Sequence, residues 1–192
     1  VLSGFISVVL FLGLDSGIAR LFADANDDSE RKQIFSQVTF CMLFFLITVL
    51  PIIYSYRNII LFNYIGDISH GDLFGILLIN LFFYLFIQNF LGLFKWTFDK
   101  LNYFVLSFGH AILTIIISIY YIKFLDLGLE SVFYGQLSSS SIFIVVGLLQ
   151  AKKYLTTRIS LNYIRSAYCV GIPICLISVL GNVIFIIERK TI

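Results

Sequence analysis

The chain has 192 residues, of which 59% are apolar, 17% aromatic and only 12% charged, with a net charge of +2 and a mean hydropathy of +0.98. An average soluble domain is about 25% charged, and a folded domain of ~150–200 residues still exposes about 30% of its unfolded surface. This composition excludes a soluble globular domain and a disordered chain, and so small a net charge excludes a nucleic-acid-binding surface. It indicates a protein whose solvent is lipid.

Five intervals without Asp, Glu, Lys or Arg divide the chain, each 21 to 24 residues long, and a shorter one occupies residues 1–14. About 20 helical residues cross the ~30 Å hydrocarbon core of a bilayer, and a helix satisfies its own backbone polar groups there. The sequence therefore predicts an all-α fold, a polytopic bundle of about six transmembrane helices. The predicted spans are 1–21, 34–54, 73–94, 103–122, 131–149 and 167–187.

The ends of the chain affect how these spans are interpreted. The first apolar stretch is already under way at Val1, and the last predicted span ends five residues before Ile192. We therefore expect a single membrane domain that is an internal fragment of a longer multi-span protein.

Positive charges in the connecting loops predict the orientation of the spans. Loops 15–32, 95–100 and 152–165 together carry nine Lys or Arg residues, whereas the alternate loops and the tail carry four. Short loops rich in Lys and Arg lie in the cytoplasm. We therefore expect these three loops to be cytoplasmic.

Uncharged polar residues within the spans are the candidate functional residues, because each needs a partner in lipid. They recur at helical spacing, which predicts one polar or small-residue face on each helix. Two interpretations remain open: contacts between helices through small residues and amides, or a water-filled cavity that accepts a polar head group. The candidate substrate-binding residues, together with a cation at the end of the first span, are Arg20, Asn80, Gln88, His110, Gln136 and Asn182.

No sequence pattern points to catalysis. The chain has no phosphate-binding loop, dinucleotide fingerprint, nucleophile elbow or zinc-protease motif. We therefore expect a protein that is not an enzyme, with no catalytic residue, cofactor or metal.

Three segments resemble a known family. The first is Leu12–Phe22, followed by an acidic loop and Glu30–Lys32; the second is Leu127–Val132 with Gly135–Leu137; the third is Gly171–Pro173 with Glu188 and Arg189 after the span. In order and spacing they resemble polysaccharide flippases of the Wzx (O-antigen) type, polysaccharide biosynthesis proteins of the multidrug/oligosaccharidyl-lipid/polysaccharide (MOP) exporter superfamily. The sequence departs at Gly17, where the family often has Ala, and at Glu188, where it usually has Asp.

The resemblance implies a MATE-like fold in which this chain corresponds to helices two to seven of about twelve to fourteen, working by alternating access. It implies a multi-pass protein of the bacterial inner membrane that translocates lipid-linked oligosaccharide repeat units. Its expected partners are the bilayer, an undecaprenyl-pyrophosphate-type glycan lipid as substrate, and proteins of polysaccharide assembly. Arg20 at the cytoplasmic mouth is expected to attract the pyrophosphate.

Two other functions remain as alternatives. A drug/cation antiporter of the same superfamily would need an acidic residue deep in a span, and the five long intervals contain none. A membrane-embedded polysaccharide polymerase or glycosyltransferase would need a long outer loop with clustered Arg and His. The two predicted outer loops, 57–72 and 123–130, supply only Arg57, His70 and Lys123, so the charge pattern favours the flippase.

Overall fold

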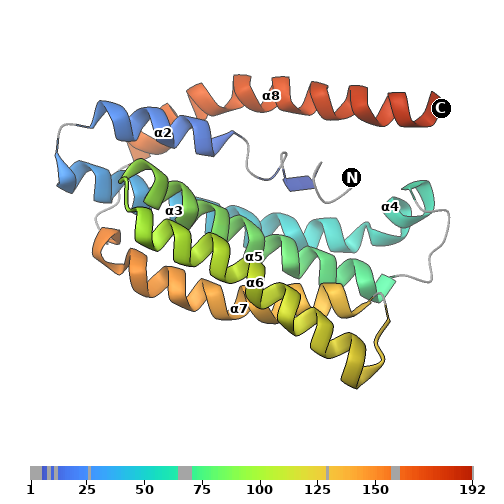
Figure 1. The fold of residues 1–192 in the computed structure, drawn as a ribbon. Coiled ribbons are helices and arrows are strands. Elements are labelled where there is room, and N and C mark those ends of the chain that lie inside the picture. The colour runs from blue at the N-terminus through green and yellow to red at the C-terminus, as the bar shows by residue number, and fades with distance from the viewer. Residues whose placement is uncertain are drawn as a thin grey trace. The chain divides into compact units, whose positions relative to one another are not determined.

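The computed structural model describes residues 6–7, 10, 13–25, 27–64, 71–128, 130–156 and 161–191. Every regular element in these ranges is a helix, which confirms the all-α prediction for this part of the chain. The helices, labelled in Figure 1, are α2 (Leu14–Asp24), α3 (Asp28–Ser55), α4 (Arg57–Tyr64), α5 (Gly71–Trp96), α6 (Lys100–Leu125), α7 (Glu130–Ala151) and α8 (Leu161–Thr191), with a 3₁₀ turn, η1 (Lys152–Tyr154), after α7.

Four helices in the described ranges are long and apolar enough to cross a membrane: α3, α5, α6 and α7 with its 3₁₀ extension. Each contains one of the four central predicted spans. The apolar part of α8 found by the same criteria is shorter, Arg165–Gly181. The predicted span 1–21 lies partly outside the described residues, and its described end forms α2. Four of the six predicted spans are thus supported by length and composition.

Helix α4 was not predicted, because the sequence analysis assigned residues 57–72 to a loop between two spans. The chain turns at Tyr56, whose N–H donates to the carbonyls of Ile52 and Ile53, and helix resumes at Arg57. Pro51 lies inside α3, where it lacks an N–H to donate. Because α4 has only 8 residues, it is too short to cross a bilayer and does not form a long apolar interval in the sequence.

The chain divides into two compact units, Val1–Leu43 with Lys153–Ile192, and Phe44–Lys152. In the first unit α2 packs against α8. Gly13 and Gly17 make this contact close, because a Cβ on Gly13 would overlap the Gly171 carbonyl and a Cβ on Gly17 would overlap that of Ala167. Gly13 also has φ +66°, a conformation that favours glycine.

In the second unit α5, α6 and α7 lie side by side (Figure 1). A short turn joins α5 to α6, and Asp99 caps α6 by accepting hydrogen bonds from the backbone N (3.3 Å) and Nδ2 (2.8 Å) of Asn102. Asp126 and Gly128, both with positive φ, turn the chain into α7, where the Ser131 hydroxyl donates to the Gly128 carbonyl at 2.6 Å. The bond from the Asn102 N–H satisfies one of the backbone donors that the start of a helix leaves unpaired.

Inside this three-helix unit, large side chains on one helix pack against small residues on another. Helix α5 contributes bulky buried side chains, including Leu85, Phe90 and Phe94, whereas α7 buries mainly Ser, Gly and Ala. Gly147 of α7 receives the ring of Phe90, since a Cβ there would lie 2.6 Å from the ring. Small residues facing large ones bring the helix axes close, as is common between helices in lipid.

Candidate functional site

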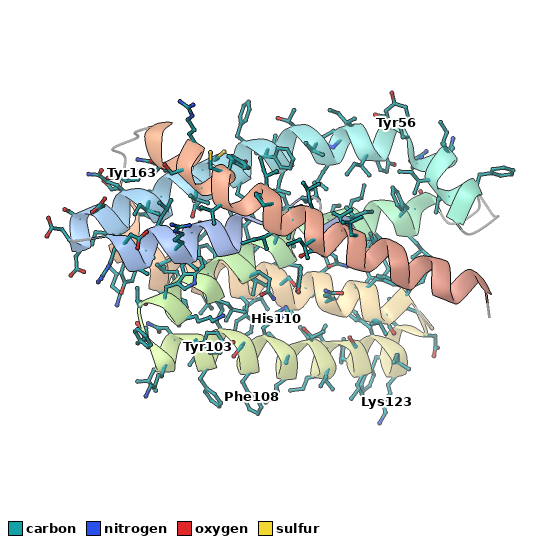
Figure 2. The ribbon with its side chains drawn as sticks, turned by 90° about the horizontal axis from the view of Figure 1, so that it is seen from above. Tyr56, Tyr103, Phe108, His110, Lys123 and Tyr163 are labelled. Atoms are coloured by element: carbon teal, nitrogen blue, oxygen red, sulfur yellow. The ribbon has the colours of Figure 1, made fainter. Side chains whose placement is uncertain are left out.

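His110 is at the centre of the polar contact between α6 and α7. Its Nε2 lies 3.0 Å from the hydroxyl of Ser140, and its backbone carbonyl accepts from the Ser139 hydroxyl at 3.1 Å. The imidazole meets Phe143 edge to face, with 5.7 Å between ring centroids. Figure 2 shows His110 extending from α6 toward the neighbouring helices, while Phe108 points away from them. His110 thus serves the helix contact, the first of the two interpretations that the sequence left open.

The same face of α6 continues this contact over three further turns. The Tyr121 and Ser138 hydroxyls lie 2.9 Å apart. A Cβ on Gly135 would overlap the Ser118 hydroxyl and lie 2.9 Å from the Ser118 Cα. The helices therefore touch almost backbone to backbone at this point, and side chains leave no room for a ligand between Gly135 and Ser118.

Asn80 links α5 to α7. It is 4% exposed, and its Nδ2 donates to the Phe133 carbonyl at 3.0 Å. Its Oδ1 is buried and accepts no hydrogen bond from the described residues, and the buried Ser118 hydroxyl has no partner among them either. These two oxygens therefore have unused hydrogen-bonding capacity inside the second unit. Leaving a buried acceptor unsatisfied costs free energy.

The predicted polar stripe of α5 does not share one environment. Asn80 is buried, Gln88 is half-buried, and Tyr84 between them is exposed. Residues spaced by four advance by about 40° around a helix of 3.6 residues per turn, so the stripe winds across the surface. Gln136 on α7 is also half-buried. The sequence spacing located these residues on their helices but did not fix their burial.

The two remaining candidates belong to the other unit. Arg20 forms an ion pair with Asp24, with 3.8 Å between Nε and Oδ2 and both side chains about 70% exposed. Asn182 lies on α8, and its side chain is outside the described residues. Four candidates thus lie in the second unit and two in the first, with no interaction shown among the six within the described part of the chain.

Polar contacts at one end of the first unit were missed by the sequence analysis. The Ser36 hydroxyl donates to the Tyr154 carbonyl at 3.1 Å and accepts from the Thr156 N–H at 2.7 Å. The Tyr163 hydroxyl donates to Glu30 Oε1 at 3.1 Å, and this bond, with some desolvation and the negative charge of the carboxylate, raises the pKa of Tyr163. Single Ser and Tyr residues give no periodic signal, so only the structure reveals these contacts.

The comparisons with known proteins add no relative. No family model matches the sequence, and neither a curated protein nor a solved structure is significantly similar to the chain. Among the described residues no group of three or more His, Cys, Asp or Glu side chains could hold a metal ion. What the structure defines is a helical protein with four candidate membrane-crossing helices.

Proposed function

We propose that this chain is part of a transporter that moves lipid-linked oligosaccharide repeat units across the bacterial inner membrane by alternating access. The observation that carries the proposal is the contact between two segments that resemble the flippase family, Leu12–Phe22 and Gly171–Pro173. They are about 150 residues apart in the chain, yet Gly13 of the first segment lies against Gly171 of the second. One glycine from each of the two resembling segments thus takes part in the same helix contact.

The polar interior of the second unit also supports the proposal. A sugar head group is rich in hydroxyls, which donate and accept hydrogen bonds. The unused Oδ1 of Asn80 would suit such a group, or water that accompanies it. Transport makes and breaks no covalent bond, so the chain would need only to shield the head group while the isoprenoid tail stays in lipid.

Arg20 would attract the pyrophosphate of the substrate. Its ion pair with Asp24 is exposed, and exposed pairs contribute only about 0–1 kcal/mol. A diphosphate offers Arg stronger, bidentate hydrogen bonds, so exchanging Asp24 for the substrate costs little. This mechanism gives Asp24 a modest inhibitory role.

The proposal is tested in cells whose copy of the gene is deleted and then complemented. Deletion should trap lipid-linked repeat units in the inner leaflet, where periodate reaches the glycan in everted vesicles but not in right-side-out vesicles. Wild-type protein should restore access from the outer side, Arg20→Ala should slow it several-fold, and Arg20→Lys should be intermediate. Lys123→Ala, which removes an exposed cation at the other end of a span, is the matched control.

Normal outer-side access in the deletion strain, with no other flippase gene present, would contradict the proposal. Arg20→Ala transporting as fast as wild type would remove the role of Arg20 and leave transport itself standing.

A further inference from the structure

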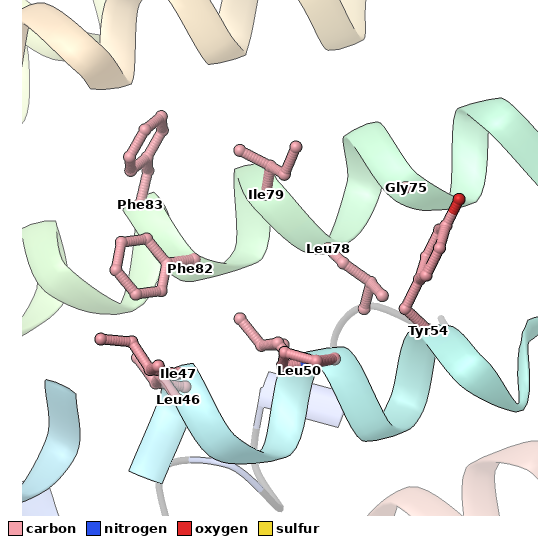
Figure 3. Close-up of a pocket in the computed structure, with 10 residues that line it drawn as sticks. Leu46, Ile47, Leu50, Tyr54, Gly75, Leu78, Ile79, Phe82 and Phe83 are labelled. Atoms are coloured by element: carbon pink, nitrogen blue, oxygen red, sulfur yellow. The ribbon is translucent and has the colours of Figure 1, made fainter. Parts of the chain in front are cut away.

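An apolar groove lies between α3 and α5 within the second unit (Figure 3). Its volume is about 660 Å³, within the ~300–1,000 Å³ typical of ligand sites. The lining residues are Leu46, Ile47, Leu50, Pro51 and Tyr54 from α3, and Gly75, Leu78, Ile79, Phe82 and Phe83 from α5. The Tyr54 hydroxyl is the one polar side-chain group among them, so the groove suits a hydrocarbon.

The length of the groove matches one lipid chain. Leu46 and Tyr54 are eight residues apart on α3, as are Gly75 and Phe83 on α5, and eight residues of helix rise ~12 Å. One leaflet contributes about half of the ~30 Å hydrocarbon core. Both helices are long enough to cross that core, so the groove extends along most of a single leaflet.

The groove is too narrow for another helix. Side chains of α3 and α5 already face each other across it, and at one end the Tyr54 ring reaches α5, where a Cβ on Gly75 would lie 3.3 Å from the ring (Figure 3). Leu46 and Leu78 are almost completely buried. A helix with its side chains is about 10 Å across, whereas a chain of methylene groups fits between such walls.

A cation stands beside the Tyr54 end of the groove. Arg57 donates from Nη1 to the Tyr54 hydroxyl, and its guanidinium carbon lies 4.6 Å from the centre of the Tyr54 ring. Arg57 also reaches the start of α5, since a Cβ on Gly71 would lie 3.9 Å from its Nε. The exposed Asp72 in the first turn of α5 forms no ion pair with it, and neither does any other carboxylate in the described ranges.

Within the described residues, most of the donors of Arg57 therefore remain for an anion. Guanidinium binds phosphate through parallel hydrogen bonds, and the positive end of the α5 dipole adds to the attraction. Tyr54 gives the site an amphipathic ring at the boundary between hydrocarbon and head group, where such rings are favoured.

We infer that this groove binds one anionic phospholipid of the bilayer, with an acyl chain between α3 and α5 and its phosphate on Arg57. Charge complementarity at Arg57 selects the head group, and the matched length selects a chain that stays in one leaflet. The inference does not depend on the transport function proposed above.

The test uses the full-length protein in vesicles of equal parts phosphatidylglycerol and phosphatidylethanolamine, followed by native mass spectrometry. Wild type should retain one phosphatidylglycerol. Arg57→Gln should lower its retention about tenfold, the effect expected from losing a charge-assisted hydrogen bond. Ile79→Trp, which fills the groove from its exposed rim, should lower retention similarly.

Two matched variants separate the site from general effects. Lys123→Gln removes another exposed cation, and Ile116→Trp enlarges another exposed side chain, on α6; both should retain the lipid as wild type does. Helix content by circular dichroism and a single peak in size exclusion establish that each variant is folded.

Three outcomes would overturn the inference. They are equal retention of the two phospholipids by wild type, unchanged retention in folded Arg57→Gln or Ile79→Trp, and displacement of phosphatidylglycerol by an equimolar polyprenyl phosphate. The last would assign the groove to an isoprenoid lipid. The experiment measures lipid retention and not transport. The lipid-binding inference can therefore fail or succeed independently of the flippase proposal.

Discussion

Helices α5 and α6 are equal in length and almost equally apolar, yet they occupy different environments. Each has 26 residues, but 56% of the most apolar stretch of α5 is buried, against 11% of that of α6. Leu106 and Ser118 are the buried residues of α6, and its outer surface carries exposed Phe, Ile and Tyr side chains. In water such a surface would cause aggregation, whereas lipid solvates it as well as a protein interior does.

The comparison teaches that hydropathy reports which helices are apolar enough to cross a membrane, but not which helix is central in the three-helix unit. Helix α5 contacts α4, α6 and α7 and holds them through bulky side chains. Helix α6 is attached mainly to α7, along a strip of small and polar residues. Three changes should test this difference, from the largest effect to the smallest.

The first change is Gly135→Leu, at the closest approach of α7 to α6. A side chain there meets the backbone of Ser118 (Cα and N at 2.9 Å), which cannot move aside as a flexible side chain could. We expect more than the ~1–3 kcal/mol of ordinary overpacking, and hence loss of monodisperse protein in detergent, measured by fluorescence-detected size exclusion.

Gly181→Leu is the control for this change, because among the described residues no atom lies within 4 Å of a Cβ at Gly181. If Gly135→Leu elutes like this control, the close contact between α6 and α7 is wrong.

The second change compares two phenylalanines. Phe90 on α5 is fully buried, whereas Phe104 on α6 is 57% exposed. Phe90→Ala should lower the free energy of unfolding by about 3 kcal/mol, the lower end for a buried ring, because lipid reduces the transfer contribution. Phe104→Ala should change it by less than about 0.5 kcal/mol. Unfolding by titration with a denaturing detergent measures both, and equal effects would contradict the central position of α5.

The third and smallest effect is the coupling between His110 and Ser140. A double-mutant cycle with His110→Ala and Ser140→Ala should give about 0.6 kcal/mol, the average for hydrogen bonds between helices in a membrane. Ser141, whose hydroxyl donates to the Leu137 carbonyl of its own helix, provides the control cycle with His110 and should show no coupling. Zero coupling in both cycles would mean that the His110–Ser140 bond contributes nothing to the α6–α7 contact.

Candidate site residues were only partly predictable. The sequence identified Asn80 and His110 as polar residues that need partners, and the structure supplies the Phe133 carbonyl and the Ser140 hydroxyl. The groove could not be predicted from the sequence, because apolar residues such as Ile47 and Ile79 have the same hydropathy whether they face a groove or open lipid. The sequence shows Arg57 only as a cation in a predicted loop, and its place beside Tyr54 depends on the formation of α4.

By itself the sequence determined that long apolar helices form, and each of the four central predicted spans lies inside one of them. That information is local, because charge and hydropathy add up along a single segment and a helix satisfies its own backbone. The tertiary structure alone decided that α5 is central, that Gly135 meets Ser118 and that Gly13 meets Gly171. These helix contacts depend on which two helix faces fit together most closely. In lipid, side-chain shape and single hydrogen bonds determine which faces pair, rather than hydrophobicity.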